Sequence, residues 1–203
     1  MKRFALLSIF VLSTLMSISQ DYTKLTTAFS ESYVNEKSGK YADAITGLKA
    51  FYDANSYEIN LRLGWLTYLQ GQFSESLGYY NKAIELMPYA IEPRLGLALP
   101  ASALGNWDLV VTQYNKILSI DPNNTLTLYR MGLVSYEKKD YQQAYKYFEK
   151  VVNLYPFDHE GLLMLAWTNF KLGKTREAKV LFNKALLYNP DDASAKEGLG
   201  LIK

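Results

Sequence analysis

Residues 57–88 read YEINLRLGWLTYLQGQFSESLGYYNKAIELMP, and this stretch decides the fold because its pattern recurs along the chain. Its closing residue, Pro88, is followed by Pro122, Pro156 and Pro190, each 34 residues after the one before. A fixed period of this length is typical of stacked helical repeats, in which each helix–turn–helix unit buries its apolar face only against its neighbours. We therefore expect an all-α chain built from such units.

Four positions of the period suit two closely packed helices. Counted from the first residue of each 34-residue frame, positions 8 and 20 hold mostly small residues, which let antiparallel helices approach each other. Position 24 holds a large ring in every frame, and position 32 holds the proline, which ends the second helix because it has no N–H group. The rings at position 24 are Tyr80, Tyr114, Phe148 and Phe182.

The turn between the two helices of a frame is marked by glycine at position 15. Gly71, Gly105 and Gly173 stand there, and glycine just past a helix end adopts the left-handed cap conformation at little cost. The frame that begins at residue 125 has Lys139 at this position. We therefore expect that turn either to be built differently or to carry backbone strain.

The pattern resembles the tetratricopeptide repeat (TPR) family, whose marks include Leu–Gly at positions 7–8, an aromatic residue at 24, Ala at 27 and Pro at 32. Leu63–Gly64, Tyr80, Ala83 and Pro88 match these marks, although no frame has the family's large residue at position 4 as a tryptophan. The resemblance implies a TPR-type right-handed helical solenoid of about five helix-turn-helix repeats. Its predicted repeats are 25–56, 57–90, 91–124, 125–158 and 159–192, with a capping helix at 193–203, all within one solenoid over 20–203.

The first nineteen residues have the layout of a secretory signal peptide. Lys2 and Arg3 precede a mostly apolar stretch, and Ser17 and Ser19 place small residues before a cleavage point after Ser19. The alternative is an uncleaved membrane anchor, although the apolar stretch is shorter than a spanning helix needs. We therefore expect an exported protein, periplasmic or associated with the cell envelope, with no stable membrane span once the leader 1–19 is removed.

The composition argues against an enzyme. The 203-residue chain has no cysteine and a single histidine, His159, which cannot form the usual zinc ligand sets and is expected to be a solvated residue at a helix start. No Gly-x-x-x-x-Gly-Lys-Ser/Thr phosphate loop occurs, and without the leader's two basic residues the chain is electrically neutral. We expect no catalytic residues, no cofactor, no metal, no small-molecule substrate and no nucleic acid.

The resemblance also implies where a partner binds, because the first helices of TPR repeats line the concave face. Positions 5, 9 and 12 are mostly apolar or aromatic here, and position 6 holds an arginine in two frames, which favours a protein or peptide partner with a carboxylate contact at the edge. The candidate residues are Leu61, Arg62, Trp65, Tyr68, Leu95, Leu99, Tyr129, Arg130, Leu133, Tyr136, Leu163, Trp167 and Phe170.

Two alternatives stay open at this point. Trp65 and Trp167 fit a structural role as well as a binding role, because aromatic residues at helical spacing often belong to a core. The favoured function is a scaffold or adaptor that assists assembly of a bacterial cell-envelope complex. The alternative is a structural protein that self-associates as a homo-oligomer through Leu201 and Ile202, without a separate client.

Overall fold

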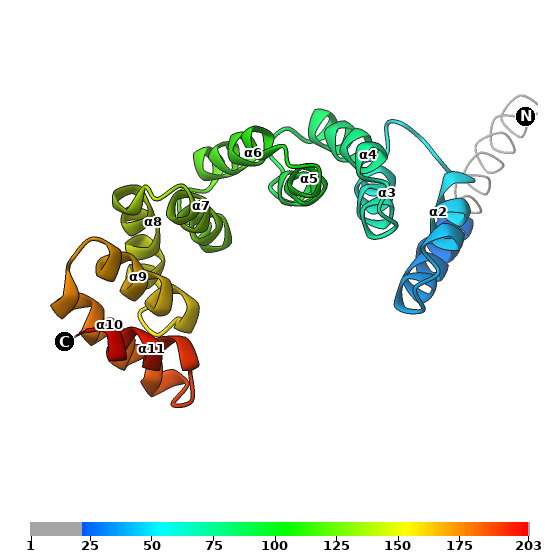
Figure 1. Cartoon of the computed structure of the whole chain (residues 1–203). Coiled ribbons are helices and arrows are strands. Elements are labelled where there is room, and N and C mark those ends of the chain that lie inside the picture. The colour runs from blue at the N-terminus through cyan, green and yellow to red at the C-terminus, as the bar shows by residue number, and fades with distance from the viewer. Residues whose placement is uncertain (1–21, 203) are drawn as a thin grey trace, which may run out of the picture. The chain divides into compact units, whose positions relative to one another are not determined.

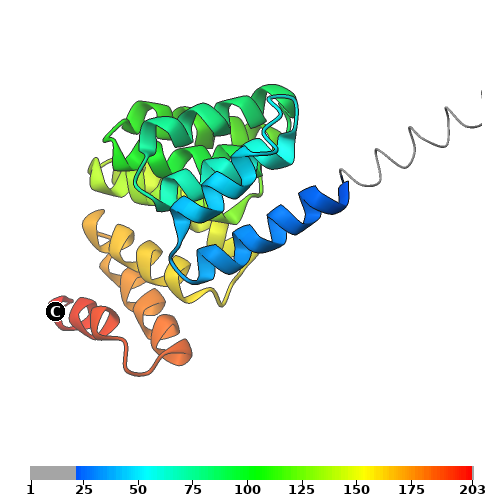
Figure 2. The same cartoon turned by 90° about the vertical axis from the view of Figure 1, so that its right-hand side faces the viewer.

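The computed structural model describes residues 22–202, and in this range it contains helices and turns but no strand (Figures 1 and 2). The chain divides into two compact units after Val110, so unit 1 is described over residues 22–110 and unit 2 over 111–202. The predicted leader lies outside the described residues. Unit 1 contains a helix over residues 22–37 and then α2 (Tyr41–Lys49), α3 (Tyr57–Leu69), α4 (Phe73–Leu86) and α5 (Glu92–Ala103).

The second unit continues the same alternation of helices. Helix α6 (Trp107–Ile120) crosses the division between the units. Unit 2 then holds α7 (Thr125–Glu137), α8 (Tyr141–Leu154), α9 (His159–Lys171), α10 (Thr175–Tyr188) and α11 (Ala193–Leu201). The prediction of an all-α fold made of helix–turn–helix repeats with a helix at the C-terminal end is confirmed. The exact repeat and domain boundaries stay predictions.

Helix pairs within a frame form the main contacts of both units. Helix α3 packs on α4, α7 on α8, and α9 on α10, while the next first helix packs on the preceding second helix, as α5 does on α4. The small and large residues of the period form the core between them. Positions 8, 20, 24 and 27 are buried in every 34-residue frame, among them Gly64, Ser76, Tyr80 and Ala83 in the first of these frames.

The ring at position 24 requires glycine on the facing helices. A Cβ atom added to Gly96 would lie 2.3 Å from the Tyr80 ring, and one added to Gly198 would lie 2.3 Å from the Phe182 ring. Such distances are far below ordinary contact between carbon atoms. The two glycines therefore permit the close approach of α5 to α4 and of α11 to α10.

The turns at position 15 share one backbone conformation. Gly71, Gly105 and Gly173 have positive φ values between 72° and 81°, as predicted, and Lys139 has a φ of 61°. The Lys139 and Gly71 N–H groups each donate to the carbonyl three residues earlier, at 2.9 Å in both turns. Of the two expectations for Lys139, strain therefore holds, because the turn has the same construction with a residue that disfavours it.

Side-chain caps begin several of the first helices. The side chains of Ser56, Asn124, Asp158 and Asp192 accept hydrogen bonds from the backbone N–H groups three residues further on, at the starts of α3, α7, α9 and α11. Each of these four residues directly precedes its helix, and the last three follow a repeat proline by two residues, whereas α5 begins without a side-chain cap. Acidic residues at these starts also complement the helix dipole.

Candidate partner-binding surface

The thirteen candidate residues all lie on first helices, six of them in unit 1 and seven in unit 2. Helices α3 and α5 carry the unit 1 surface, and α7 and α9 carry the unit 2 surface. All of them except Arg62 are half-buried. In unit 2, Leu133, Leu163 and Phe170 pack against the core clusters on one side while keeping part of their surface in solvent. Side chains in this state can contribute both to the core and to a contact with another molecule.

Trp65 in unit 1 is tied to the helix over residues 22–37. Its Nε1 donates to the Glu36 carboxylate at 2.8 Å, and the other Glu36 oxygen pairs with the Arg62 guanidinium at 2.5 Å. Burial by itself raises the pKa of Glu36, but the hydrogen bonds from Trp65 and Arg62 outweigh it and hold that pKa below its ordinary value. The three side chains therefore form one network that joins two neighbouring first helices.

Arg62 is placed differently from the expectation of a residue at the edge. It is only 7% exposed, its Nε donates to Ser32 Oγ at 3.0 Å, and its guanidinium carbon lies 3.9 Å from the centre of the Tyr33 ring. The carboxylate it contacts belongs to Glu36 of the same chain. Arg62 therefore stabilises the contact between helices, whereas the half-buried Arg130 donates to Tyr114 Oη at 3.3 Å and keeps part of its surface in solvent.

Trp167 in unit 2 occupies the same repeat position as Trp65 but has neutral partners. Its Nε1 donates to Ser194 Oγ of α11 at 2.8 Å. Its ring lies edge-on to Phe182 and Phe170, with centroids 5.1 and 5.8 Å away. These contacts support the structural alternative for the two tryptophans, because both side chains connect neighbouring helices.

Tyr129 links the unit 2 surface to the start of α9. Its hydroxyl donates to Glu160 at 3.5 Å, and its ring lies 5.7 Å from Phe148. Burial, followed by the nearby Glu160 carboxylate, raises the pKa of Tyr129 to about 12, so this phenol stays protonated at neutral pH. Glu160 itself is mostly exposed, with 63% of its side chain in solvent.

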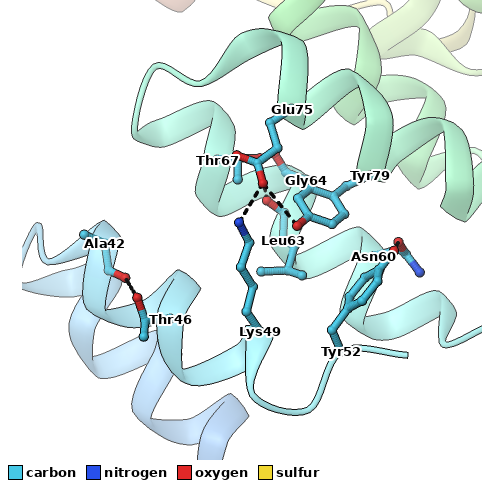
Figure 3. Close-up of polar contacts among 10 residues, drawn as sticks. All are labelled: Ala42, Thr46, Lys49, Tyr52, Asn60, Leu63, Gly64, Thr67, Glu75 and Tyr79. Carbon is cyan, nitrogen blue, oxygen red and sulfur yellow. Dashed lines mark hydrogen bonds and ion pairs between the residues drawn. The ribbon is translucent and has the colours of Figure 1, made fainter. Parts of the chain in front are cut away.

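Another polar cluster joins α2 to α4 in unit 1 (Figure 3). Lys49 Nζ lies 2.7 Å from a Glu75 carboxylate oxygen, which also accepts from the Tyr79 hydroxyl at 3.2 Å. The hydrogen bond that Lys49 donates to Glu75 raises the pKa of Lys49 above its ordinary value, although burial opposes this. The Tyr79 ring also meets Tyr52 edge-on at 5.9 Å, which adds an aromatic contact to the ionic one.

His159 is not the solvated residue that the sequence suggested. Its side chain is 12% exposed, and its two ring nitrogens lie 3.2 Å from carboxylate oxygens of Glu160 and Asp192. The Tyr188 ring covers it at a centroid distance of 5.4 Å. The correction has a simple cause, because the end of α10 and the segment before α11 fold over the start of α9.

Residues 22–202 hold no cluster of three or more histidine, cysteine or acidic residues suited to a metal ion. None of the helices in the same range has the length and apolar character needed to cross a membrane.

Sequence reasoning missed the partners of the two tryptophans. Glu36 and Ser194 stand at different positions of their frames, position 12 and position 2, so the 34-residue period gives no common signal for them. The period does predict which first helices are neighbours. A search for polar residues near Trp65 and Trp167 on those neighbours would have reached both.

Comparison with known proteins gives the family of these repeats. Two family models, both described as tetratricopeptide repeat, match residues 34–91 and 135–202. A tetratricopeptide repeat protein from Parabacteroides merdae has a crystal structure that superposes with a TM-score of 0.75 at 23% identity, covering 87% of this chain and 71% of that one.

Two curated relatives place these repeats in larger proteins. The chain is 30% identical over 162 residues to the human protein O-mannosyl-transferase TMTC1, covering 76% of this chain and 18% of that protein. It is 27% identical over 144 residues to the type IV pilus assembly protein PilF of Pseudomonas aeruginosa, covering 70% of this chain and 56% of PilF. The chain thus spans well under two thirds of the length of each.

Proposed function

Because the chain belongs to the tetratricopeptide repeat family, we propose that it is a non-enzymatic scaffold that binds a protein or peptide partner through the first-helix surfaces of its two units. The observation that carries this proposal is the recurrence of half-buried apolar and aromatic side chains at positions 5, 9 and 12. Such side chains are the usual anchors of a peptide or helix in a groove. The unit 1 surface has Leu61, Trp65, Tyr68, Leu95 and Leu99, and the unit 2 surface has Tyr129, Leu133, Tyr136, Leu163, Trp167 and Phe170.

The finer part of the proposal concerns place and task. The leader layout of residues 1–19 supports export to the periplasm or cell envelope. The likeness to PilF, named as a pilus assembly protein, supports a role in assembling a bacterial envelope complex. N-terminal sequencing of the exported protein tests the first part, since a retained Met1 contradicts cleavage.

The binding proposal is tested with a double variant of the unit 2 surface, Tyr136→Ser with Phe170→Ser. Both residues stand at position 12 and are half-buried. Each substitution removes an aromatic ring without leaving a buried charge. Partners are captured by crosslinking from the native envelope, and affinity for the purified partner is then measured. We expect a loss of at least about thirtyfold, because even one aromatic anchor at an interface contributes about 2 kcal/mol or more and the variant removes two.

The matched control is Val180→Ser on α10. Val180 is an apolar residue that is 56% exposed, and it lies on a second helix outside the candidate surface. Its affinity is expected to stay within about twofold of the parent, as for surface changes away from a contact. Equal loss in both variants, or none in the double variant, contradicts the proposal.

Self-association remains a second proposal because of one observation at the C-terminal end. Leu201 is 52% exposed at the end of α11, a first helix that has no second helix behind it among the described residues. Ile202 is half-buried and packs against the core cluster of α9 and α10, so Leu201 is the residue available for contact. Light scattering tests this second proposal. A monomer at all concentrations excludes self-association, whereas a dimer that becomes a monomer in the Leu201→Ser variant supports it.

A further inference from the structure

A pocket of about 570 Å³ lies in unit 2, where the loop between α8 and α9 meets the end of α10. Three of the residues that line it are aromatic and more than half exposed: Tyr155, Phe157 and Tyr188. Phe157 and Tyr188 meet edge to face, with ring centroids 5.4 Å apart. Exposed rings gathered in one hollow are typical of a contact site.

The charged residues that line this pocket are mainly acidic. Asp158 and Glu160 line it, no lysine or arginine does, and His159 is its only basic group. Asp158 already caps α9 by accepting from the Gly161 N–H at 2.7 Å. Glu160 also has contacts, with His159 at 3.2 Å and with the Tyr129 hydroxyl at 3.5 Å, but 63% of its side chain lies in solvent, so its carboxylate is accessible to an incoming cation.

Elsewhere in the chain, a lysine or arginine occupies the space beside a tyrosine ring and a glutamate. Lys49 pairs with Glu75 beside the ring of Tyr79, 6.0 Å from its centre, in the cluster drawn in Figure 3. Arg62 pairs with Glu36 over the ring of Tyr33.

A third internal case lies in unit 2. Lys174 Nζ stands 4.3 Å from the centre of the Tyr145 ring, and the Tyr145 hydroxyl donates to Glu149. In the first two cases the cation pairs with a glutamate beside a tyrosine ring, and in the third the glutamate contacts the hydroxyl of the ring, so each cation lies by a ring whose negative face favours its charge. The pocket at Glu160 has the rings and the glutamate, but its lining supplies no lysine or arginine.

We propose that this pocket binds an arginine side chain of the protein partner, with the guanidinium on the rings of Phe157 and Tyr188 and paired with Glu160. Arginine fits better than lysine, because its planar group stacks on a ring and pairs with a carboxylate at the same time. The inference rests on the proposed function and extends it. The Tyr129 hydroxyl on the unit 2 surface donates to the same Glu160, so the pocket borders that surface.

The test is a titration of the full chain, labelled with nitrogen-15, followed by NMR at low salt. The probe is Nα-acetyl-arginine amide, and the matched probe is Nα-acetyl-citrulline amide, which has nearly the same shape without the charge. We expect saturable shifts confined to residues 154–160 and 188 with the arginine probe, and binding of the citrulline probe about tenfold weaker or absent.

Two variants assign the effect to Glu160. Glu160→Gln keeps the shape of the side chain and is expected to weaken arginine binding by about tenfold. Asp191→Asn is the control, because Asp191 is 97% exposed, does not line the pocket and pairs on the surface with Lys196. Its affinity is expected to stay within about twofold of the parent.

Each outcome decides for or against the pocket. Shifts spread over the whole surface, equal binding of citrulline, or full binding by Glu160→Gln overturn the inference. Because the probe is a single amino acid derivative, the result does not depend on the partner. Partner binding that needs Tyr136 and Phe170 while arginine fails to bind contradicts only the pocket, and the reverse result contradicts only the proposed function.

Discussion

The two units use the same repeat positions with different chemistry. In unit 1, Trp65 donates to a carboxylate that also holds a buried arginine, so an ionic network joins neighbouring first helices. In unit 2, Trp167 donates to the hydroxyl of Ser194 on the following first helix, not the preceding one, and packs on two rings, so its contact is neutral and aromatic. The period therefore sets which helices are neighbours, while single residues set whether the contact between them is ionic or neutral.

The largest expected effect comes from removing each tryptophan. Trp167→Ala loses contacts with Phe170, Phe182 and α11, and we expect a loss of about 3 kcal/mol in the free energy of unfolding. Trp65→Ala loses one tilted ring contact, to Tyr68, and one hydrogen bond, and we expect about 2 kcal/mol. Urea unfolding measures both, and a loss below about 0.5 kcal/mol in either variant would mean that the ring is no part of the packing.

Breaking the ionic network sharpens the comparison. Glu36→Gln leaves the guanidinium of Arg62, which is 7% exposed, without its carboxylate, and we expect a loss of about 2 kcal/mol. Ser194→Ala removes the hydrogen-bond partner of Trp167 and is expected to cost about 1 kcal/mol, because only a neutral hydrogen bond is lost. Similar costs for the two variants, measured by urea unfolding, would contradict the ionic character of the first contact.

The stability contributed by the unit 1 network is expected to depend on pH. The pKa of Glu36 is lower in the folded chain than its ordinary value, so its contribution to stability is complete above the ordinary glutamate pKa and is lost as the pH falls through the folded value. The stability difference between the parent chain and Glu36→Gln is therefore expected to shrink as the pH falls below about 4. A difference that stays constant from neutral to acidic pH would show that the carboxylate's charge plays no part.

The smallest expected effect concerns the turns. Lys139 has a left-handed backbone where Gly39, Gly71, Gly105 and Gly173 have the same geometry without a side chain. Lys139→Gly is therefore expected to raise the free energy of unfolding by about 0.5–1 kcal/mol, and Gly71→Lys to lower it by a similar amount. Thermal unfolding of the two variants checks this pair, and an unchanged or lower stability of Lys139→Gly would contradict the strain.

The periodic features of the fold were predictable from the sequence. Proline at position 32, glycine at 15 and the rings at 24 each have a local physical reason, so Pro88, Gly71 and Tyr80 each indicate their role without further context. Position 24 is buried in every 34-residue frame, as expected. The departure at Lys139 indicated either a different turn or strain, and the backbone geometry decides for strain.

The contacts between frames were not predictable in the same way. The burial of His159 depends on Tyr188 and Asp192, which come from the end of one frame and the start of the next. The pairing of Arg62 with Glu36 likewise depends on how the helix over residues 22–37 is rotated against α3. Rotation of one helix against another is set by packing in three dimensions, so a one-dimensional period does not contain it.

The central claim is that the first helices form the main surface that contacts the partner. It is tested most directly by placing the photo-crosslinking residue p-benzoylphenylalanine at Leu133 on α7 or at Val180 on α10 and irradiating the native envelope. Our account predicts a discrete crosslinked partner from position 133 and none from position 180. A crosslink from position 180 with none from position 133 would contradict it.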